Sequence, residues 1–118
     1  MLTVKPDVNN DISEIKTLNA YTDGQPCGYA RFKLNGYIII LTEILPLPAD
    51  TAEIDNETFA VLDTLIRALG SWGLNHSCFY LECHDPMLYP TLGRLRFSQK
   101  DGAMKSTLRE VLQSCGGH

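Results

Sequence analysis

The sequence lacks a hydrophobic run long enough to cross a membrane. Its densest apolar stretch covers Tyr37 to Leu41, whereas a membrane-spanning helix needs roughly 20 apolar residues. The N-terminal residues Met1 to Pro6 also contain no apolar segment of the kind that secretory signals have. We therefore expect a cytoplasmic protein that has no membrane partner.

Runs of basic residues are absent as well. The 118-residue chain has 10 Lys and Arg residues against 14 Asp and Glu residues, which gives a net charge of −4 at pH 7. Binding to nucleic acid requires a cluster of positive side chains that neutralises phosphate groups. The sequence therefore predicts no nucleic-acid partner.

The four cysteines form no C-x-x-C motif. Cys78 and Cys83 are five residues apart on a segment predicted to be a strand, and an odd spacing places them on opposite faces. Cys83 and His84 are adjacent and point apart for the same reason. The pattern favours buried free thiols over a zinc site, so we expect no metal.

The overall composition is that of a globular protein. Hydrophobic residues make up 44% of the chain and charged residues 20%, which excludes a disordered or fibrous protein. The length matches the usual size of one domain. We therefore expect residues 1–118 to form a single domain with one hydrophobic core.

Alternating and β-branched residues predict several strands in the first half of the chain. Asn35-Gly36 predicts a type I′ hairpin turn, in which both central residues have positive φ. The strand that follows is apolar on both faces, which predicts a central strand covered on both sides. The expected strands are Leu2 to Lys5, Ile12 to Tyr21, Cys27 to Leu34 and Tyr37 to Leu45.

A helix is predicted from Asn56 to Trp72, because apolar residues recur there every three or four positions. Asp55 or Asn56 can cap its start, and Gly73 stands where a helix end favours positive φ. A strand, a short irregular helix and a hairpin across Asp101-Gly102 follow. Their expected ranges are Cys78 to Cys83, Asp85 to about Leu95, Phe97 to Gln99 and Met104 to Leu112.

This order of elements predicts an α+β fold. A strand–helix–strand step usually forms a parallel crossover, whereas the hairpins are antiparallel. The sheet is therefore expected to be mixed and mostly antiparallel.

Two segments carry a resemblance to a known family. Asp23 to Pro48 reads DGQPCGYARFKLNGYIIILTEILPLP, and Leu62 to Phe97 reads LDTLIRALGSWGLNHSCFYLECHDPMLYPTLGRLRF. In element order and spacing they resemble the GNAT (acyl-CoA N-acyltransferase) superfamily. The first segment is similar to the strands before the family's cofactor loop. The second is similar to its long helix, the following strand, a short helix and a Leu-Gly-Phe-like corner. The resemblance spans roughly residues 12 to 112. It implies a GNAT-like sheet flanked by helices, acetyl-CoA as cofactor and an amine as acceptor.

The resemblance also implies functional residues. Glu43 matches a strand position at which several family members place a general-base carboxylate. The alternative is that Glu43 pairs with Arg31 or Lys33 across the hairpin. By the same resemblance, Leu45 and Leu47 at the strand end and Asn56 at the start of the long helix are expected to contact the cofactor.

Tyr89 matches a family tyrosine that protonates the leaving thiolate. The letters Leu88-Tyr89-Pro90-Thr91-Leu92-Gly93 reproduce that motif except for its final phenylalanine. A second register uses Leu95-Arg96-Phe97 as the corner and puts Leu92 in the tyrosine position. In that register Tyr89 is a packing residue.

The cofactor loop departs from the family pattern. Residues 49–58 contain no glycine and no basic residue but four acids, where the family has a glycine-rich loop whose N–H groups face the pyrophosphate. Pro46 and Pro48 have no N–H to offer the pantetheine arm. These departures predict that acetyl-CoA-dependent activity is inefficient.

The chain also has no room for the family's two N-terminal helices, because only Pro6 to Asp11 separates the first two strands. One face of the apolar Tyr37 to Leu45 strand would then lack cover. We therefore expect a homodimer that buries this face.

Three functions remain open at this point. The first is a divergent GNAT-like protein that transfers acetyl groups, if at all, through a non-standard cofactor loop. The second is a non-catalytic binding or assembly module with the same fold. The third is a small-molecule-binding domain, with a polar lining that includes Glu43, His84 and Tyr89.

Overall fold

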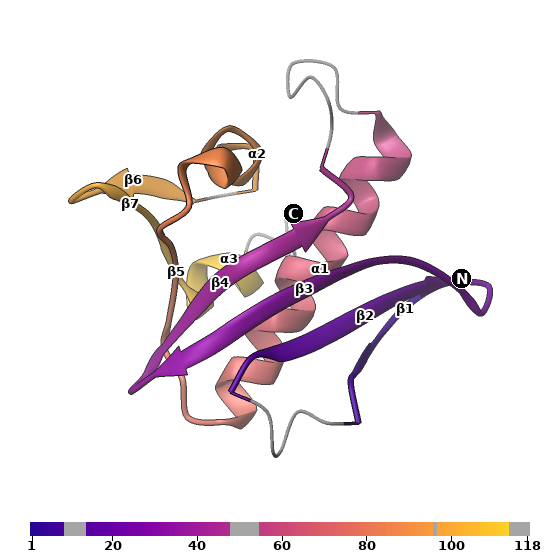
Figure 1. The fold of residues 1–118 in the computed structure, drawn as a ribbon, viewed down its shortest axis with the longest axis horizontal. Helices are drawn as coiled ribbons and strands as arrows, with labels where there is room; N and C mark the ends of the chain where they lie inside the picture. The colour runs from indigo at the N-terminus through magenta and orange to yellow at the C-terminus, as the bar shows by residue number, and fades with distance from the viewer. Residues whose placement is uncertain (9–13, 48–54, 96, 114–118) are drawn as a thin grey trace.

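The computed structural model describes residues 1–8, 14–47, 55–95 and 97–113. These residues form a seven-stranded sheet in the order β1-β2-β3-β4-β5-β7-β6, with helices packed against it (Figure 1). The strands are β1 (Leu2–Pro6), β2 (Lys16–Thr22), β3 (Gln25–Asn35), β4 (Ile38–Leu45), β5 (Tyr80–Cys83), β6 (Ser98–Lys100) and β7 (Ala103–Thr107). The helices are α1 (Asn56–Asn75), the 3₁₀ helix η2 (Pro86–Leu88), α2 (Tyr89–Gly93) and α3 (Leu108–Gln113). No helix within these ranges is long and apolar enough to cross a membrane.

β4 lies at the centre of the sheet. It pairs antiparallel with β3 and parallel with β5, and the other pairings of the described strands are antiparallel. This confirms the predicted α+β fold with a mixed, mostly antiparallel sheet. β1 and β2 pair directly, and the described residues between them contain no helix. Ile12, the predicted start of the second strand, lies outside the described residues.

The turn between β3 and β4 differs from the prediction. Asn35 pairs with Ile38, so the loop consists of Gly36 and Tyr37. Of these two residues only Gly36 has positive φ, at 61°. The prediction of a type I′ turn centred on Asn35-Gly36 is therefore wrong. Glycine with positive φ at the first central position is the pattern of a type II′ turn.

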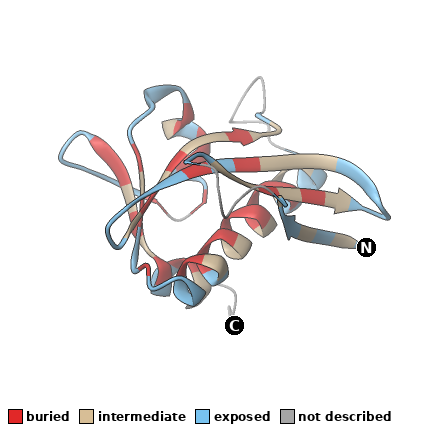
Figure 2. Ribbon diagram, turned by 60° about the horizontal axis from the view of Figure 1, so that its bottom comes forward, coloured by how far each residue is buried: buried red, intermediate tan, exposed pale blue. Residues whose placement is uncertain are grey.

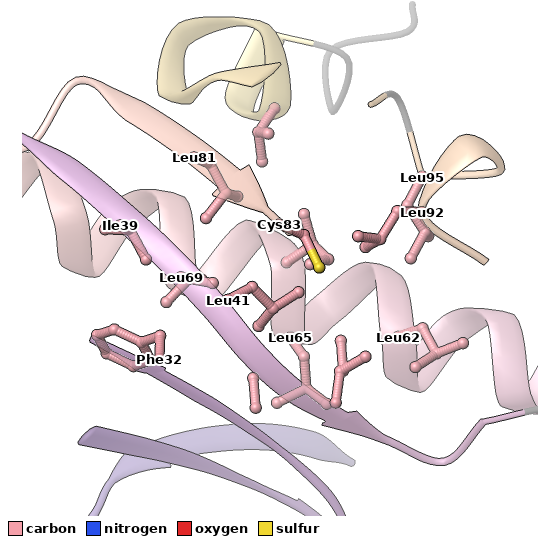
Figure 3. Close-up of a cluster of buried hydrophobic side chains, with 14 of the residues drawn as sticks. Phe32, Ile39, Leu41, Leu62, Leu65, Leu69, Leu81, Cys83, Leu92 and Leu95 are labelled. Carbon is pink, nitrogen blue, oxygen red and sulfur yellow. The ribbon is translucent and has the colours of Figure 1, made fainter. Parts of the chain in front are cut away.

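α1 covers one face of the sheet and forms the core with it. The predicted apolar spacing is confirmed, because its buried residues face the strands (Figure 2). The core side chains interlock between helix and sheet (Figure 3). Those from the sheet include Phe32, Ile39, Leu41 and Leu81, and those from α1 include Leu62, Leu65 and Leu69.

The sequence predicts that Gly73 ends the long helix, but Gly73 lies inside α1. A Cβ atom on Gly73 would be 2.6 Å from Ile39 Cδ1 and 2.7 Å from Leu108 Cδ1. The glycine therefore lets the helix approach β4 and α3 closely. The residue with positive φ comes later, at Ser77 (63°).

The predicted strand Met104 to Leu112 is wrong in its second half. β7 ends at Thr107, and the chain continues as α3. The Thr107 hydroxyl accepts a hydrogen bond from the Glu110 backbone N–H at 3.0 Å. Thr-x-x-Glu is a helix-cap signature that the alternation of apolar residues conceals.

The face of the sheet opposite α1 has no covering layer in the described part of the chain. Side chains that alternate with the buried Ala30 and Phe32 of β3 are half-buried or exposed, and so are Ile38 and Ile40 of β4. The described residues therefore supply cover for one face of β4, and the predicted cover of the second face by another subunit stays a prediction. We call this surface the open face; the strand registers place on it Tyr29, Arg31, Lys33, Ile38, Ile40, Glu43, Tyr80, Glu82 and Lys105.

Candidate functional site

β4 separates from β5 beyond the middle of the sheet. The last pair between the two parallel strands is Leu41 with Cys83, but β4 continues to Leu45. A β-bulge against β3 occurs at this point, with Thr42 as the extra residue, and the Thr42 hydroxyl donates to the Arg31 carbonyl at 3.1 Å. Bulges bend a strand and increase its twist. The bulge at Thr42 therefore accounts for the separation of the end of β4 from β5.

A cavity of about 520 Å³ lies where the two strands separate. This volume is within the usual range for small-molecule sites. The His84 ring contributes a polar group, and its Nε2 is 3.1 Å from Glu82 Oε1. The lining residues are Lys33, Ile40, Leu41, Thr42, His84, Asp85 and Pro86.

Glu43 lies on the open face within a three-residue network. Its carboxylate accepts a hydrogen bond from the Tyr29 hydroxyl at 2.7 Å and forms an ion pair with Arg31 at 3.0 Å. The Arg31 guanidinium also lies 4.5 Å from the Tyr29 ring centre. The hydrogen bond to Glu43 raises the pKa of Tyr29, since it stabilises the protonated phenol. The alternative pairing of Glu43 with Arg31 across the hairpin is thus confirmed.

Tyr89 begins α2 and is tied to the β6–β7 turn. Its hydroxyl donates to the Gly102 carbonyl at 2.8 Å, and its ring packs half-buried against the core. Leu92 and Leu95 are also buried; Arg96, in the second register, lies outside the described residues. Tyr89 and Glu43 therefore make different polar contacts, and the Tyr89 hydroxyl links α2 to the β6–β7 turn.

Leu45 and Leu47 line a hollow on the β3 side of β4, away from β5. Its volume is about 660 Å³. Apolar and aromatic side chains dominate the lining, with Asn19 as a polar group. The other lining residues are Tyr21, Pro26, Cys27, Gly28, Tyr29 and Pro46.

The N-terminus of α1 is capped by a carboxylate. Asp55 Oδ1 accepts a hydrogen bond from the Thr58 backbone N–H at 2.6 Å, which confirms one of the two predicted caps. This hydrogen bond lowers the pKa of Asp55. Asn56 is the first helical residue and is exposed. Pro48 and residues 49–54 of the predicted cofactor loop lie outside the described residues.

The Asp55 cap makes the stability of the fold depend on pH. Because its pKa is lowered in the folded state, the cap stabilises the protein above the ordinary aspartate pKa of 3.8. This stabilisation is lost as the pH falls through the lower, folded-state value. We expect Asp55→Asn, which still caps a helix, to show a smaller fall in melting temperature on acidification than the native chain. Equal slopes for both proteins in a thermal melt series would contradict this.

Cys78 and Cys83 are both buried free thiols, and burial raises the pKa of each. Cys78 precedes β5, which begins at Tyr80, so placing the pair on opposite faces of one strand was wrong. Within the described ranges, no three His, Cys, Asp or Glu side chains gather as metal ligands do.

Two comparisons with known proteins find nothing: no family model matches the chain, and neither does any curated protein. Solved structures do match. Aminoglycoside 6′-acetyltransferase type Ii superimposes with a TM-score of 0.59 at 11% identity, over 85% of this chain and 73% of that one. The PaiA N-acetyltransferase of Thermoplasma acidophilum, in complex with coenzyme A, gives 0.58 at 12% identity, over 82% and 62%. A KacTA–DNA complex gives 0.64 at 9% identity, over 100% of both chains. At these identities the likeness concerns the fold alone.

Proposed function

Because the chain has the fold of the GNAT N-acetyltransferases, we propose that it is a divergent, non-catalytic protein of this fold. It serves as a binding module and does not transfer acetyl groups efficiently from acetyl-CoA. The observation that carries this proposal is the carboxylate cap of α1. Asp55 Oδ1 accepts the Thr58 N–H at the helix end where the enzymes that the sequence resembles hold the cofactor pyrophosphate.

The charge at this helix end argues against a pyrophosphate. An anion binds a helix N-terminus through free N–H groups and the positive end of the helix dipole. Here Asp55 already uses one of these N–H groups, and Glu57 adds a second carboxylate in the first turn. A phosphate group would meet two negative charges and no basic side chain from residues 49–58.

The end of β4 is equally unsuited to the pantetheine arm. β4 leaves β5 after Leu41, which would open an edge for a ligand that pairs as an added strand. Pro46 follows the strand directly and has no N–H to donate. The residues present therefore do not fit acetyl-CoA in the usual way.

The hollow beside Leu45 and Leu47 supports a binding role. At about 660 Å³ it falls within the range of ligand sites. Its apolar and aromatic lining, with the Asn19 amide for orientation, suits a largely apolar small molecule.

Titration calorimetry with acetyl-CoA tests the proposal. We expect the native chain to give no saturable heat up to about 1 mM cofactor, equivalent to a binding free energy weaker than about −4 kcal/mol. Asp55→Asn keeps the cap but removes its charge, and it serves as the matched variant. Micromolar binding by the native chain would overturn the proposal.

A second candidate is an active acetyl-CoA:amine N-acetyltransferase. The cavity of about 520 Å³ between β4 and β5 favours it, because Glu43 lies one residue beyond the lining and could accept a proton from an amine. Binding in the same titration, followed by turnover of an amine that Glu43→Gln lowers by a factor of about 10²–10⁴, would select this candidate. Arg31→Gln would separate a catalytic role of Glu43 from a role in the ion pair.

A further inference from the structure

We propose that the hollow beside Leu45 and Leu47 binds an uncharged aromatic ligand that carries a hydrogen-bonding group such as a carboxamide. The aromatic part of the ligand contacts Tyr21 and Tyr29, and its polar group pairs with the Asn19 amide; all three residues line the hollow. The inference rests on the proposed function as a binding module and names the chemical class of its ligand.

The hollow is built on three neighbouring strands, β2, β3 and β4 (Figure 1). Asn19 of β2 lies opposite Tyr29 of β3, and Tyr29 lies opposite Leu45 of β4. Directly opposed side chains are close enough to act together across a sheet. Each of the three is next to a buried residue along its strand, so all three lie on the open face; the buried neighbours are Leu18, Ala30 and Ile44. One row across the sheet therefore supplies an amide, an aromatic ring and an aliphatic group.

The Tyr29 ring is held in place before any ligand arrives. Its hydroxyl donates to Glu43 at 2.7 Å, and the Arg31 guanidinium lies over the ring, 4.5 Å from its centre. A side chain that is already ordered loses little conformational entropy on binding, which favours affinity. Aromatic groups also attract one another by more than their buried area alone accounts for. The hollow therefore presents a fixed aromatic wall that suits an aromatic ligand.

The wall of the hollow selects against charge. None of the described residues that line it has a charged side chain. The charged groups that contact Tyr29, Arg31 and Glu43, form an ion pair with each other at 3.0 Å. Lys5 pairs in register with Asn19 but is exposed and does not belong to the lining. An ionised ligand would lose water here without gaining an opposite charge in the wall, and that loss is costly.

Asn19 supplies the polar contact. Its amide offers both donors and an acceptor, the same set that a carboxamide ligand presents in return. Within the described ranges, no hydrogen bond engages the Asn19 side chain. The volume of about 660 Å³ is sufficient for a two-ring ligand. These features together favour a neutral, flat ligand with an amide-like edge.

An NMR titration of the ¹⁵N-labelled protein tests the inference with three probes that share a naphthalene ring and differ in charge at pH 7. The probes are 2-naphthamide, which is neutral, 2-naphthoate, an anion, and 2-naphthylmethylamine, a cation. We expect 2-naphthamide to bind with a dissociation constant of about 1 mM or tighter, the usual range for a ligand of this size. It should shift the resonances of the Asn19 side-chain amide and the Gly28 backbone, both in the hollow. The two charged probes should bind at least about tenfold more weakly.

Two variants locate the site. Asn19→Leu keeps the size of the side chain but removes its amide, and it should raise the dissociation constant of 2-naphthamide about tenfold. Tyr29→Leu removes the aromatic wall and is an independent second variant in case Asn19→Leu does not fold. Gln99→Leu is the control, because it makes the same amide-to-leucine change at an exposed position of β6, at the far edge of the sheet.

Four results would each overturn the inference. They are equally tight binding of a charged probe, shifts confined to residues outside the hollow, native affinity in both hollow variants, and no binding of 2-naphthamide up to about 2 mM. The acetyl-CoA titration separates this inference from the proposed function. Micromolar binding of acetyl-CoA would overturn the proposed function and leave the result with the naphthyl probes standing.

Discussion

Gly28→Ala is expected to lower the free energy of unfolding by at least about 2 kcal/mol. A Cβ atom at this position would lie 2.5 Å from the Leu45 carbonyl oxygen, 3.0 Å from Val61 Cγ1 and 3.1 Å from Pro46 Cδ. The nearest atom belongs to the backbone, so no rotamer change relieves the overlap, and inserted methyl groups in packed sites typically cost 1–3 kcal/mol. Urea unfolding followed by circular dichroism measures the change.

Gly93→Ala is the matched control for this substitution. Gly93 also lies in a regular element without positive φ, but its added Cβ would meet only Met104 Cε at 3.8 Å, an ordinary contact. We expect an effect within about 0.5 kcal/mol. Equal destabilisation by the two substitutions would show that the approach of β3 to the end of β4 is looser than described. The same result would weaken the assignment of the hollow beside Leu45, which Gly28 lines.

Phe32→Ala is expected to cost about 3–5 kcal/mol of stability, the usual range for a large aromatic residue lost from a core. Phe32 is fully buried on β3, and its ring meets the Trp72 ring edge-on, with centres 4.9 Å apart and planes at 70°. The substitution leaves a cavity between the sheet and α1. Urea unfolding followed by the fluorescence of Trp72, the only tryptophan in the chain, gives the value.

Val8→Ala provides the baseline for that measurement, because Val8 is 93% exposed. Its expected effect is within about 0.5 kcal/mol. A loss of less than about 2 kcal/mol for Phe32→Ala would mean that α1 is not packed on β3 through this ring.

The sequence predicts the framework of the fold because its signals there are local. Apolar residues at helical spacing define α1, and Asp-Gly dipeptides mark two turns. At Asp23-Gly24 and Asp101-Gly102 both residues have positive φ, as type I′ turns require. The helix after Thr107 is missed because the alternation of apolar residues conceals its local Thr-x-x-Glu cap. Gly73 is predicted wrongly because close packing of α1 on β4 and α3 decides its place inside the helix. Such contacts join residues that are far apart in the sequence.

The site is less accessible to sequence reasoning than the fold. Nothing in the local pattern marks Tyr29, which meets Glu43 only because β3 and β4 pair in one register. The pairing with Arg31 depends on the same register and on the extra residue Thr42, which together set Arg31 opposite Glu43. The contact of the Tyr89 hydroxyl with the Gly102 carbonyl likewise forms only because the fold brings α2 and the β6–β7 turn together.

The extra residue at Thr42 changes the phase of β4. Ile39 and Leu41 point into the core, and strict alternation would send the next odd residue, Glu43, in as well. The bulge shifts the count by one, so that Ile44 is fully buried and the Glu43 carboxylate remains in contact with solvent. The alternation of inward and outward side chains along β4 therefore shifts by one residue at Thr42. If Thr42 were paired in regular alternation, a carboxylate would replace an isoleucine at the hydrophobic centre, whereas deletion of Thr42 would leave Glu43 outward and Ile44 inward. The second half of β4 therefore keeps its apolar side chains in the core only because one residue stays outside the pairing.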